Sequence, residues 1–159
     1  MFGFKKKAKK ELIASIDGKL IPIEEVKDPV FSQKMMGDGY AIVSTGDTVY
    51  ACAQGEVTML FPSGHAVGLT LEDGMEILIH IGIDTVNENG KGFSVLCEKG
   101  QKVKAGDPLV KMDRAYLEEK GYDLTVIMIF TKADAYKSFE LSEDRNVKAG
   151  NSLAATYTK

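Results

Sequence analysis

Cysteine is scarce in this sequence, and tryptophan is absent from its 159 residues. The two cysteines, Cys52 and Cys97, are too few for a disulfide scaffold and form no CxxC pair, so we expect reduced thiols in a cytoplasmic protein. No apolar run approaches the roughly 20 residues that cross a bilayer. The basic run at residues 5–10 precedes only a short apolar stretch, which Ser15 and Asp17 interrupt, and this does not fit a secretory signal peptide.

Positive charge is also in short supply, since the formal net charge is -3. This balance argues against nucleic acid as a partner, because nucleic-acid binding requires a basic surface. Hydrophobic residues make up 44% and charged residues 27%, which is typical of one globular domain. We therefore predict a basic, mobile tail over residues 1–15 and a single domain over residues 16–159. The tail's lysines allow at most weak contact with an anionic membrane surface, at about 1 kcal/mol per basic residue.

Short apolar runs separated by Gly, Asp and Asn follow one another after residue 16, a pattern typical of an all-β domain. Helical periodicity is limited to one short segment, Arg114–Lys120. We therefore predict a single all-β domain with only short helices. The predicted strands are Tyr40–Ser44, Thr48–Ala53, Glu56–Phe61, Ala66–Leu71, Met75–Ile83, Pro108–Met112, Leu124–Phe130 and Ser152–Thr158.

The most informative segment is MEILIHIGID, at residues 75–84. Side chains of a strand alternate between its two faces. The face predicted to point into the core is a uniform β-branched row: Ile77, Ile79, Ile81 and Ile83. The opposite face is predicted to carry one imidazole, one carboxylate and an open glycine position: Leu78, His80, Gly82 and Asp84. A strand whose register is fixed by such a row holds His80 rigidly, as a reactive group requires.

The sequence contains one other histidine, His65, in the segment FPSGHAVG. The pattern alone leaves open whether the two histidines are ordinary surface or core residues, or whether they meet across neighbouring strands. If they meet, the chemistry is nucleophilic, because an imidazole with a pKa near 6.5 is largely neutral at about pH 7 and can attack phosphorus without a separate base. A second imidazole alongside can donate a hydrogen bond to the phosphoryl oxygens.

Five strings of the sequence carry a resemblance to a known family. They are DPVF at residues 28–31, MMGDG at 35–39, HAVGL at 65–69, EILIHIGIDTV at 76–86 and GFSVLCEKGQKVKAGDPLV at 92–110. Together they resemble the glucose-type enzyme IIA domain of the bacterial phosphoenolpyruvate-dependent sugar phosphotransferase system. The resemblance implies an antiparallel, barrel-like β-sandwich that works as a phosphoryl carrier, and we expect it to need no cofactor.

The same resemblance implies partners and roles for the two histidines. His80 would accept a phosphoryl group from the phosphocarrier protein HPr and pass it to a cysteine-bearing IIB domain of a sugar permease. His65 would stabilise the phosphoryl group. Ser63 stands where the family usually has threonine, and its hydroxyl can still orient His65. Family members also bind regulatory protein targets in a phosphorylation-dependent way, and the sequence identifies neither the sugar nor the IIB partner.

A carrier meets several partners briefly, so we expect His80 to lie in a shallow patch of exposed apolar side chains. Alternation places Leu78 in this patch. The resemblance adds Val30, Phe31, Met36, Phe61 and Val86.

Two carboxylates, Asp28 and Asp84, would form a negative rim complementary to a basic HPr. Alternatives stay open for three of these residues. Phe31 and Phe61 could be ordinary core residues, and Asp84 could instead make turn hydrogen bonds at Thr85.

Three other functions remain to be weighed. A zinc hydrolase could use His65, His80 and Asp84, but four residues of an extended strand span about 13 Å, whereas two ligands of one zinc lie within about 4 Å of each other. The two histidines could still hold zinc adventitiously or with ligands from a partner. A biotin or lipoyl carrier needs a lysine at a hairpin tip, and neither Lys111 nor Lys132 has the complete tip motif. A phosphorylation-dependent regulatory binding protein is the third alternative.

Overall fold

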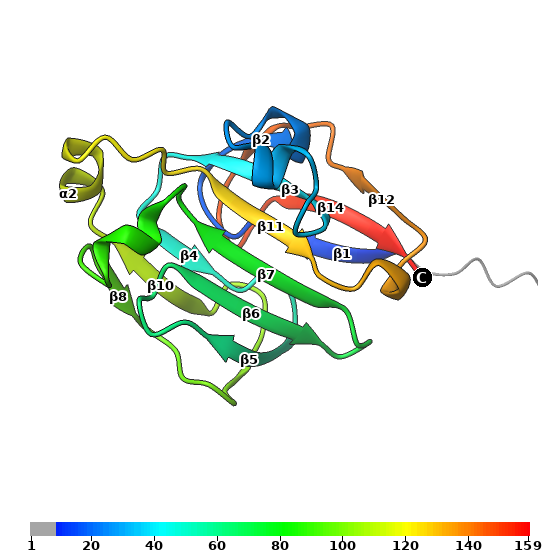
Figure 1. Cartoon of the computed structure of the whole chain (residues 1–159). Helices are drawn as coiled ribbons and strands as arrows, with labels where there is room; N and C mark the ends of the chain where they lie inside the picture. Colours follow the sequence, from blue (N-terminus) through cyan, green and yellow to red (C-terminus); the bar gives the residue numbers. More distant parts are fainter. Residues whose placement is uncertain (1–8) are drawn as a thin grey trace, which may run out of the picture.

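The computed structural model describes residues 9–159, and residues 1–8 lie outside it. Within the described part, the chain forms antiparallel β-sheets with two short α-helices (Figure 1). The largest sheet has eight strands in the order β13 (Asn146–Val147), β2 (Gly18–Pro22), β3 (Asp38–Ser44), β11 (Val126–Phe130), β7 (Glu76–Ile81), β6 (Ala66–Leu71), β5 (Gly55–Leu60) and β9 (Lys102–Val103). The predicted all-β sandwich with only short helices is confirmed.

Two three-stranded sheets and a few helical turns complete the fold. One small sheet contains β1 (Lys10–Ile13), β14 (Leu153–Thr158) and β12 (Ser138–Leu141), and the other contains β4 (Thr48–Tyr50), β10 (Pro108–Met112) and β8 (Phe93–Val95). The helical segments are η1 (Ile23–Glu25), α1 (Pro29–Ser32), η2 (Thr85–Glu88), α2 (Arg114–Glu119) and η3 (Ala133–Ala135). None of the helices in residues 9–159 is long and apolar enough to cross a membrane.

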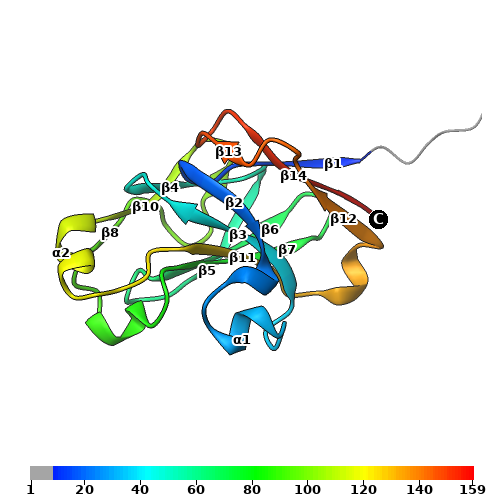
Figure 2. The same ribbon diagram turned by 90° about the horizontal axis from the view of Figure 1, so that it is seen from above.

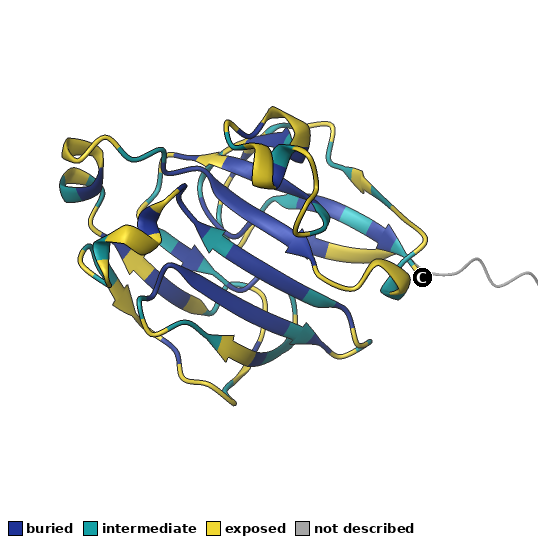
Figure 3. Ribbon diagram, viewed as in Figure 1, coloured by how far each residue is buried: buried dark blue, intermediate teal, exposed yellow. Residues whose placement is uncertain are grey.

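The main hydrophobic core lies between the large sheet and the two small sheets. Ile77, Ile79 and Ile81 of β7 point into it, together with Leu12 of β1 and Leu109 of β10. All five side chains are at most 1% exposed. Figure 3 shows the same pattern, with buried residues along the strands and exposed residues mainly in the connections. Each side chain of this kind contributes about 1.5–3 kcal/mol by leaving water.

A second apolar cluster covers the other face of the large sheet. Because strand side chains alternate, Leu78 points to the face opposite Ile77 and Ile79, where it joins Ile127 and Ile129 of β11. The segment of η1 and α1 packs over this face, which in Figure 2 lies on the far side of the sheet from β1 and β14. His80 therefore lies on a rigid sheet, at the border of a covering segment.

Several predicted boundaries agree with the structure and others need correction. Strands β6 and β10 have the predicted limits, and α2 is one residue shorter than predicted. The tail limit at residue 15 is wrong, because Lys10–Ile13 pairs with β14 and Leu12 is fully buried; the rest of the predicted tail, residues 1–8, lies outside the described residues. The short strands β2, β8, β9, β12 and β13 were not predicted.

The end of the central strand is the most consequential correction. The strand stops at Ile81 rather than Ile83, because Gly82 has a φ of 81° and turns the chain. Ile83 consequently packs in the second cluster with Leu78, not in the main core with Ile77 as predicted.

Candidate functional site

His80 lies near the end of β7, on the face that carries the second cluster. Ala66 of β6 and Ile127 of β11 flank it in register, and both are fully buried, whereas His80 is partly exposed. Its Nδ1 lies 2.8 Å from the carbonyl oxygen of Gly82. A carbonyl oxygen can only accept, so Nδ1 carries the proton of the neutral ring, and Nε2 is left with the lone pair. His80 is thereby held as a nucleophile at Nε2.

The bend at Gly82, directly after the strand, brings its carbonyl oxygen to Nδ1 of His80. A Cβ atom on Gly82 would lie 2.5 Å from the Cγ2 atom of Thr85, so only glycine fits this turn. The Thr85 hydroxyl donates to the carbonyl oxygen of Ile81 at 2.5 Å and so stabilises the turn. Sequence reasoning treated Gly82 as an opening in the surface and missed its carbonyl group as the partner of His80. The missed signal was a glycine two residues after a histidine at a strand end.

His65 immediately precedes β6 and faces His80. The two ring centroids are 5.2 Å apart with an interplanar angle of 76°. The Ile81 amide donates to the carbonyl oxygen of His65 at 2.7 Å, which ties the two strands together at this level. The hydroxyl of Ser63 contacts Nδ1 of His65. The two histidines therefore meet across neighbouring strands, which the sequence pattern alone left open, and Ser63 is in contact with His65.

Burial sets the charge state of both rings. The pKa of His80 is lowered below its usual value near 6.5, chiefly because the ring loses water, although the Gly82 carbonyl and the charges of Asp28 and Asp84 oppose this. The pKa of His65 is lowered by burial and by the neighbouring His80. Both imidazoles are therefore neutral at about pH 7.

The apolar surroundings of His80 agree only partly with the predicted docking patch. Val30, Met36 and Val86 are 40%, 42% and 46% exposed, as predicted. The predicted exposure of Phe31 and Leu78 is wrong: they are 5% and 8% exposed, because α1 packs on the sheet.

Two aromatic rings contact the histidines. Phe31 lies under His80, with ring centroids 5.0 Å apart. Phe61 is half-buried against the second cluster and lies 5.3 Å from the ring of His65. Both phenylalanines therefore support the imidazoles, which is closer to the core alternative than to an open docking surface.

The two predicted rim carboxylates are placed differently. Asp84 is exposed and has a φ of 63°, and no side-chain hydrogen bond from it caps η2. Asp28 is partly exposed, and its carboxylate accepts a hydrogen bond from the Val30 amide at 2.9 Å, capping α1. This capping role of Asp28 was not predicted.

The zinc alternative can be examined on the same geometry. Because the chain turns at Gly82, the spacing expected for a straight strand does not apply between His80 and Asp84. Over residues 9–159, however, no group of three or more His, Cys, Asp or Glu side chains is placed to hold a metal ion. The structure thus gives no support to a zinc hydrolase. Cys52 and Cys97 are buried and unpaired with each other.

Comparison with known proteins gives consistent matches. A family model described as phosphoenolpyruvate-dependent sugar phosphotransferase system, EIIA 1, matches residues 10–136. A glucose-specific EIIA component from Staphylococcus epidermidis is 40% identical over 160 residues, covering 99% of this chain and 96% of that protein. A glucose-specific EIIA component from Halalkalibacterium halodurans is 40% identical over 164 residues, covering 98% and 95%.

A larger relative and a solved structure extend these matches. The glucose-specific EIICBA component of Streptococcus pneumoniae is 41% identical over 144 residues, or 91% of this chain, but the chain spans only 20% of that protein. The solved structure of glucose permease IIA from Mycoplasma capricolum superposes with a TM-score of 0.86 at 36% identity, covering 98% of this chain and 99% of the other.

Proposed function

Because this chain belongs to the EIIA 1 family of the phosphoenolpyruvate-dependent sugar phosphotransferase system, we propose that His80 is the residue on which it carries phosphate. The chain is a phosphoryl carrier component of a sugar phosphotransferase system. The observation that supports His80 is its hydrogen bond to Gly82, which leaves a free lone pair on Nε2 of this partly exposed ring.

The accepting step needs no base. Nε2 of His80 attacks the phosphorus of a phosphohistidine on the donor, and the new N–P bond forms as the donor's N–P bond breaks. The donor imidazole leaves with the electron pair of that bond. The phosphorylated ring of His80 then carries a positive charge, which is delocalised over its two nitrogens. The Gly82 carbonyl oxygen stabilises this charge by accepting the hydrogen bond from Nδ1–H. When an acceptor thiolate attacks the phosphorus, the N–P bond breaks, its electron pair returns to Nε2, and His80 departs as a neutral imidazole, which is a good leaving group.

His65 stabilises the transferred group. If the Ser63 hydroxyl donates to Nδ1 of His65, the proton of that ring lies on Nε2 and can be donated to a phosphoryl oxygen. Such a preorganised donor matters most where charge develops in the transition state. Ser63 is thus a positioning residue that acts through the tautomer of His65.

The partners are HPr as donor and the IIB domain of a permease as acceptor. The docking face consists of the exposed apolar side chains around His80 with a carboxylate at the edge: Val30, Met36, Val86 and Asp84. Phe31 and Leu78 stiffen it from beneath. One relative is named as an EIICBA component, so a IIB domain is the acceptor to test. The relatives are named as glucose-specific, so glucose is the first sugar to test. Such exchange takes place in the cytoplasm.

Incubation with purified phosphoenolpyruvate, enzyme I and HPr tests the proposal. We expect one acid-labile, base-stable phosphate per chain, and none in the His80→Ala variant. Circular dichroism should show that the variant keeps its fold, because a partly exposed side chain contributes little to stability. Undiminished labelling of His80→Ala would refute the assignment.

A further inference from the structure

Glu88, the last residue of η2, is held by two tyrosines from a distant part of the chain. Its Oε1 atom accepts a hydrogen bond from the Tyr116 hydroxyl at 2.6 Å, and its Oε2 atom accepts one from the Tyr122 hydroxyl at 2.5 Å. Lys120 lies 3.7 Å from Oε1. The Glu88 side chain is only 9% exposed. Each carboxylate oxygen therefore has its own phenol donor, a two-point attachment that an isolated surface carboxylate lacks.

This attachment holds one end of the segment that carries the edge of the docking face. Thr85 is fully buried and Glu88 points to the tyrosines, whereas Asp84 and Val86 are exposed. Both ends of the turn have left-handed backbone, with φ of 63° at Asp84 and 54° at Asn89. Such conformations persist only where the surroundings hold them. The two inward anchors, Thr85 and Glu88, thus determine how Val86 between them and Asp84 directly before them are presented.

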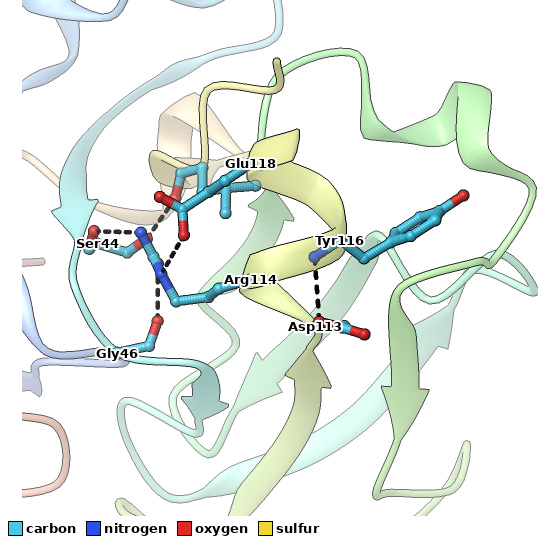
Figure 4. A network of polar contacts seen from close by, with 7 residues as sticks. Ser44, Gly46, Asp113, Arg114, Tyr116 and Glu118 are labelled. Carbon is cyan, nitrogen blue, oxygen red and sulfur yellow. Dashed lines mark hydrogen bonds and ion pairs between the residues drawn. The ribbon is translucent and has the colours of Figure 1, made fainter. Parts of the chain in front are cut away.

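Helix α2, which provides Tyr116 and ends three residues before Tyr122, is itself fixed. Arg114 of α2 donates to the Ser44 hydroxyl and to the Gly46 carbonyl oxygen, both at 2.8 Å, and to the Ser44 carbonyl oxygen at 3.1 Å. Figure 4 shows Arg114 directed to this turn and Tyr116 projecting from the opposite side of α2. The clamp therefore connects η2 to an element that is bound to the large sheet's β3, not to an independent loop.

We propose that Glu88, gripped by Tyr116 and Tyr122, is a positioning residue that fixes Asp84 and Val86 for docking of the phosphoryl donor. This inference rests on the proposed function. Because Glu88 touches neither histidine ring, it should act on the encounter and not on the transfer. A preorganised edge avoids an ordering cost when the partner binds. Loss of the clamp should therefore raise the half-saturating concentration of phospho-HPr and leave the limiting rate of transfer unchanged.

Transfer from phospho-HPr, measured over a range of donor concentrations, is the first test. Glu88→Ala should raise the half-saturating concentration about 5–10-fold with the limiting rate changed less than about twofold. Tyr122→Phe, which removes one of the two donors, should give a smaller change in the same direction. Glu88→Gln should restore most of the loss, because its amide can accept from one phenol and donate to the other. Glu119→Ala removes an exposed carboxylate at the last residue of α2 and serves as the control.

Hydrogen exchange supplies a readout that does not depend on transfer. The amides of Asn87 and Asn89 donate within the turn, to Asp84 and Val86. Their exchange should accelerate in Glu88→Ala and return in Glu88→Gln. An unchanged exchange rate overturns the clamp, whatever the transfer data. Faster exchange with an unchanged half-saturating concentration, or a lower limiting rate alone, overturns the docking role. If wild-type protein accepts nothing from phospho-HPr, the proposed function has failed instead.

Discussion

The Nδ1 atom of His80 lies 2.8 Å from the carbonyl oxygen of Gly82, two residues further along the chain. Since this bond requires the proton on Nδ1, the phosphoryl group should be carried on Nε2. Long-range proton–nitrogen NMR of ring-labelled protein should show the Nδ1-protonated tautomer before phosphorylation and a phosphorus coupling at Nε2 afterwards. A phosphate on Nδ1 would contradict the geometry, because that nitrogen would have to give up its bond to Gly82.

The lowered histidine pKa values predict a specific pH dependence. Only the neutral ring of His80 is a nucleophile, so transfer from phospho-HPr should stay level from about pH 8 down to about 6.5 and fall only at lower pH. NMR titration of the ring protons should give values below 6.5 for both histidines. His80→Gln should raise the pKa of His65, because the neighbouring ring adds to the effect of burial.

The same shifts affect folding. A histidine whose pKa is lower in the folded state binds protons more readily when unfolded, so stability is lost as the pH falls below the unfolded value near 6.5. Thermal unfolding between pH 8 and 5 should show this loss. His65→Gln should reduce this loss of stability. A pH dependence identical to that of the wild type would mean that the pKa of His65 is not lowered in the folded state.

The chemistry of the site could be predicted from sequence better than its shape. Alternation along β7 placed His80 opposite the isoleucine row, since a two-residue period depends only on the strand itself. The turn at Gly82 could not be predicted from that period, and it moved Ile83 to the other cluster and brought a carbonyl group to His80.

The burial of Phe31 was equally beyond a strand pattern. It depends on α1 folding back over a sheet face that is formed by residues far away in the chain, including Ile127 and Ile129. The short strand β1 was wrongly predicted to be part of a mobile tail for a similar reason. Its partner, β14, is the last strand of the chain, and nothing local to Lys10–Ile13 indicates that pairing.

His65 and Ser63 should matter more for passing the phosphoryl group on than for receiving it. His65→Gln keeps a donor of similar reach, so His80 should still be labelled, but onward transfer to a IIB domain should fall about 10²-fold or more. Ser63→Ala should give a weaker defect of the same kind, and Ser63→Thr should behave as wild type, because it retains the hydroxyl next to His65. Equal losses in the two half-reactions would contradict this role.

Phe31 and Val30 are neighbours on α1 with opposite burial, which makes them a matched pair. Phe31→Ala should cost about 3–5 kcal/mol of unfolding free energy, because the ring is buried under His80. Val30→Ala should change stability by less than about 0.5 kcal/mol, since its side chain is 40% exposed. Urea unfolding measures both. Val30→Ala should nevertheless slow transfer from phospho-HPr, whereas an unaltered rate would remove Val30 from the docking face.

Asp84 offers a test of charge without a change of shape. Its φ of 63° is a conformation that asparagine also adopts readily, so Asp84→Asn should keep the turn and remove only the carboxylate charge. A rim charge steers the encounter with a basic partner, and salt screens this effect over about 10 Å at 0.1 M. We expect Asp84→Asn to slow transfer from phospho-HPr mainly at low ionic strength and to flatten the dependence of the rate on salt. Stopped-flow transfer rates between 20 mM and 500 mM salt, with Glu119→Ala as the control, decide the matter. If both variants retain the wild-type salt dependence, Asp84 does not face the donor.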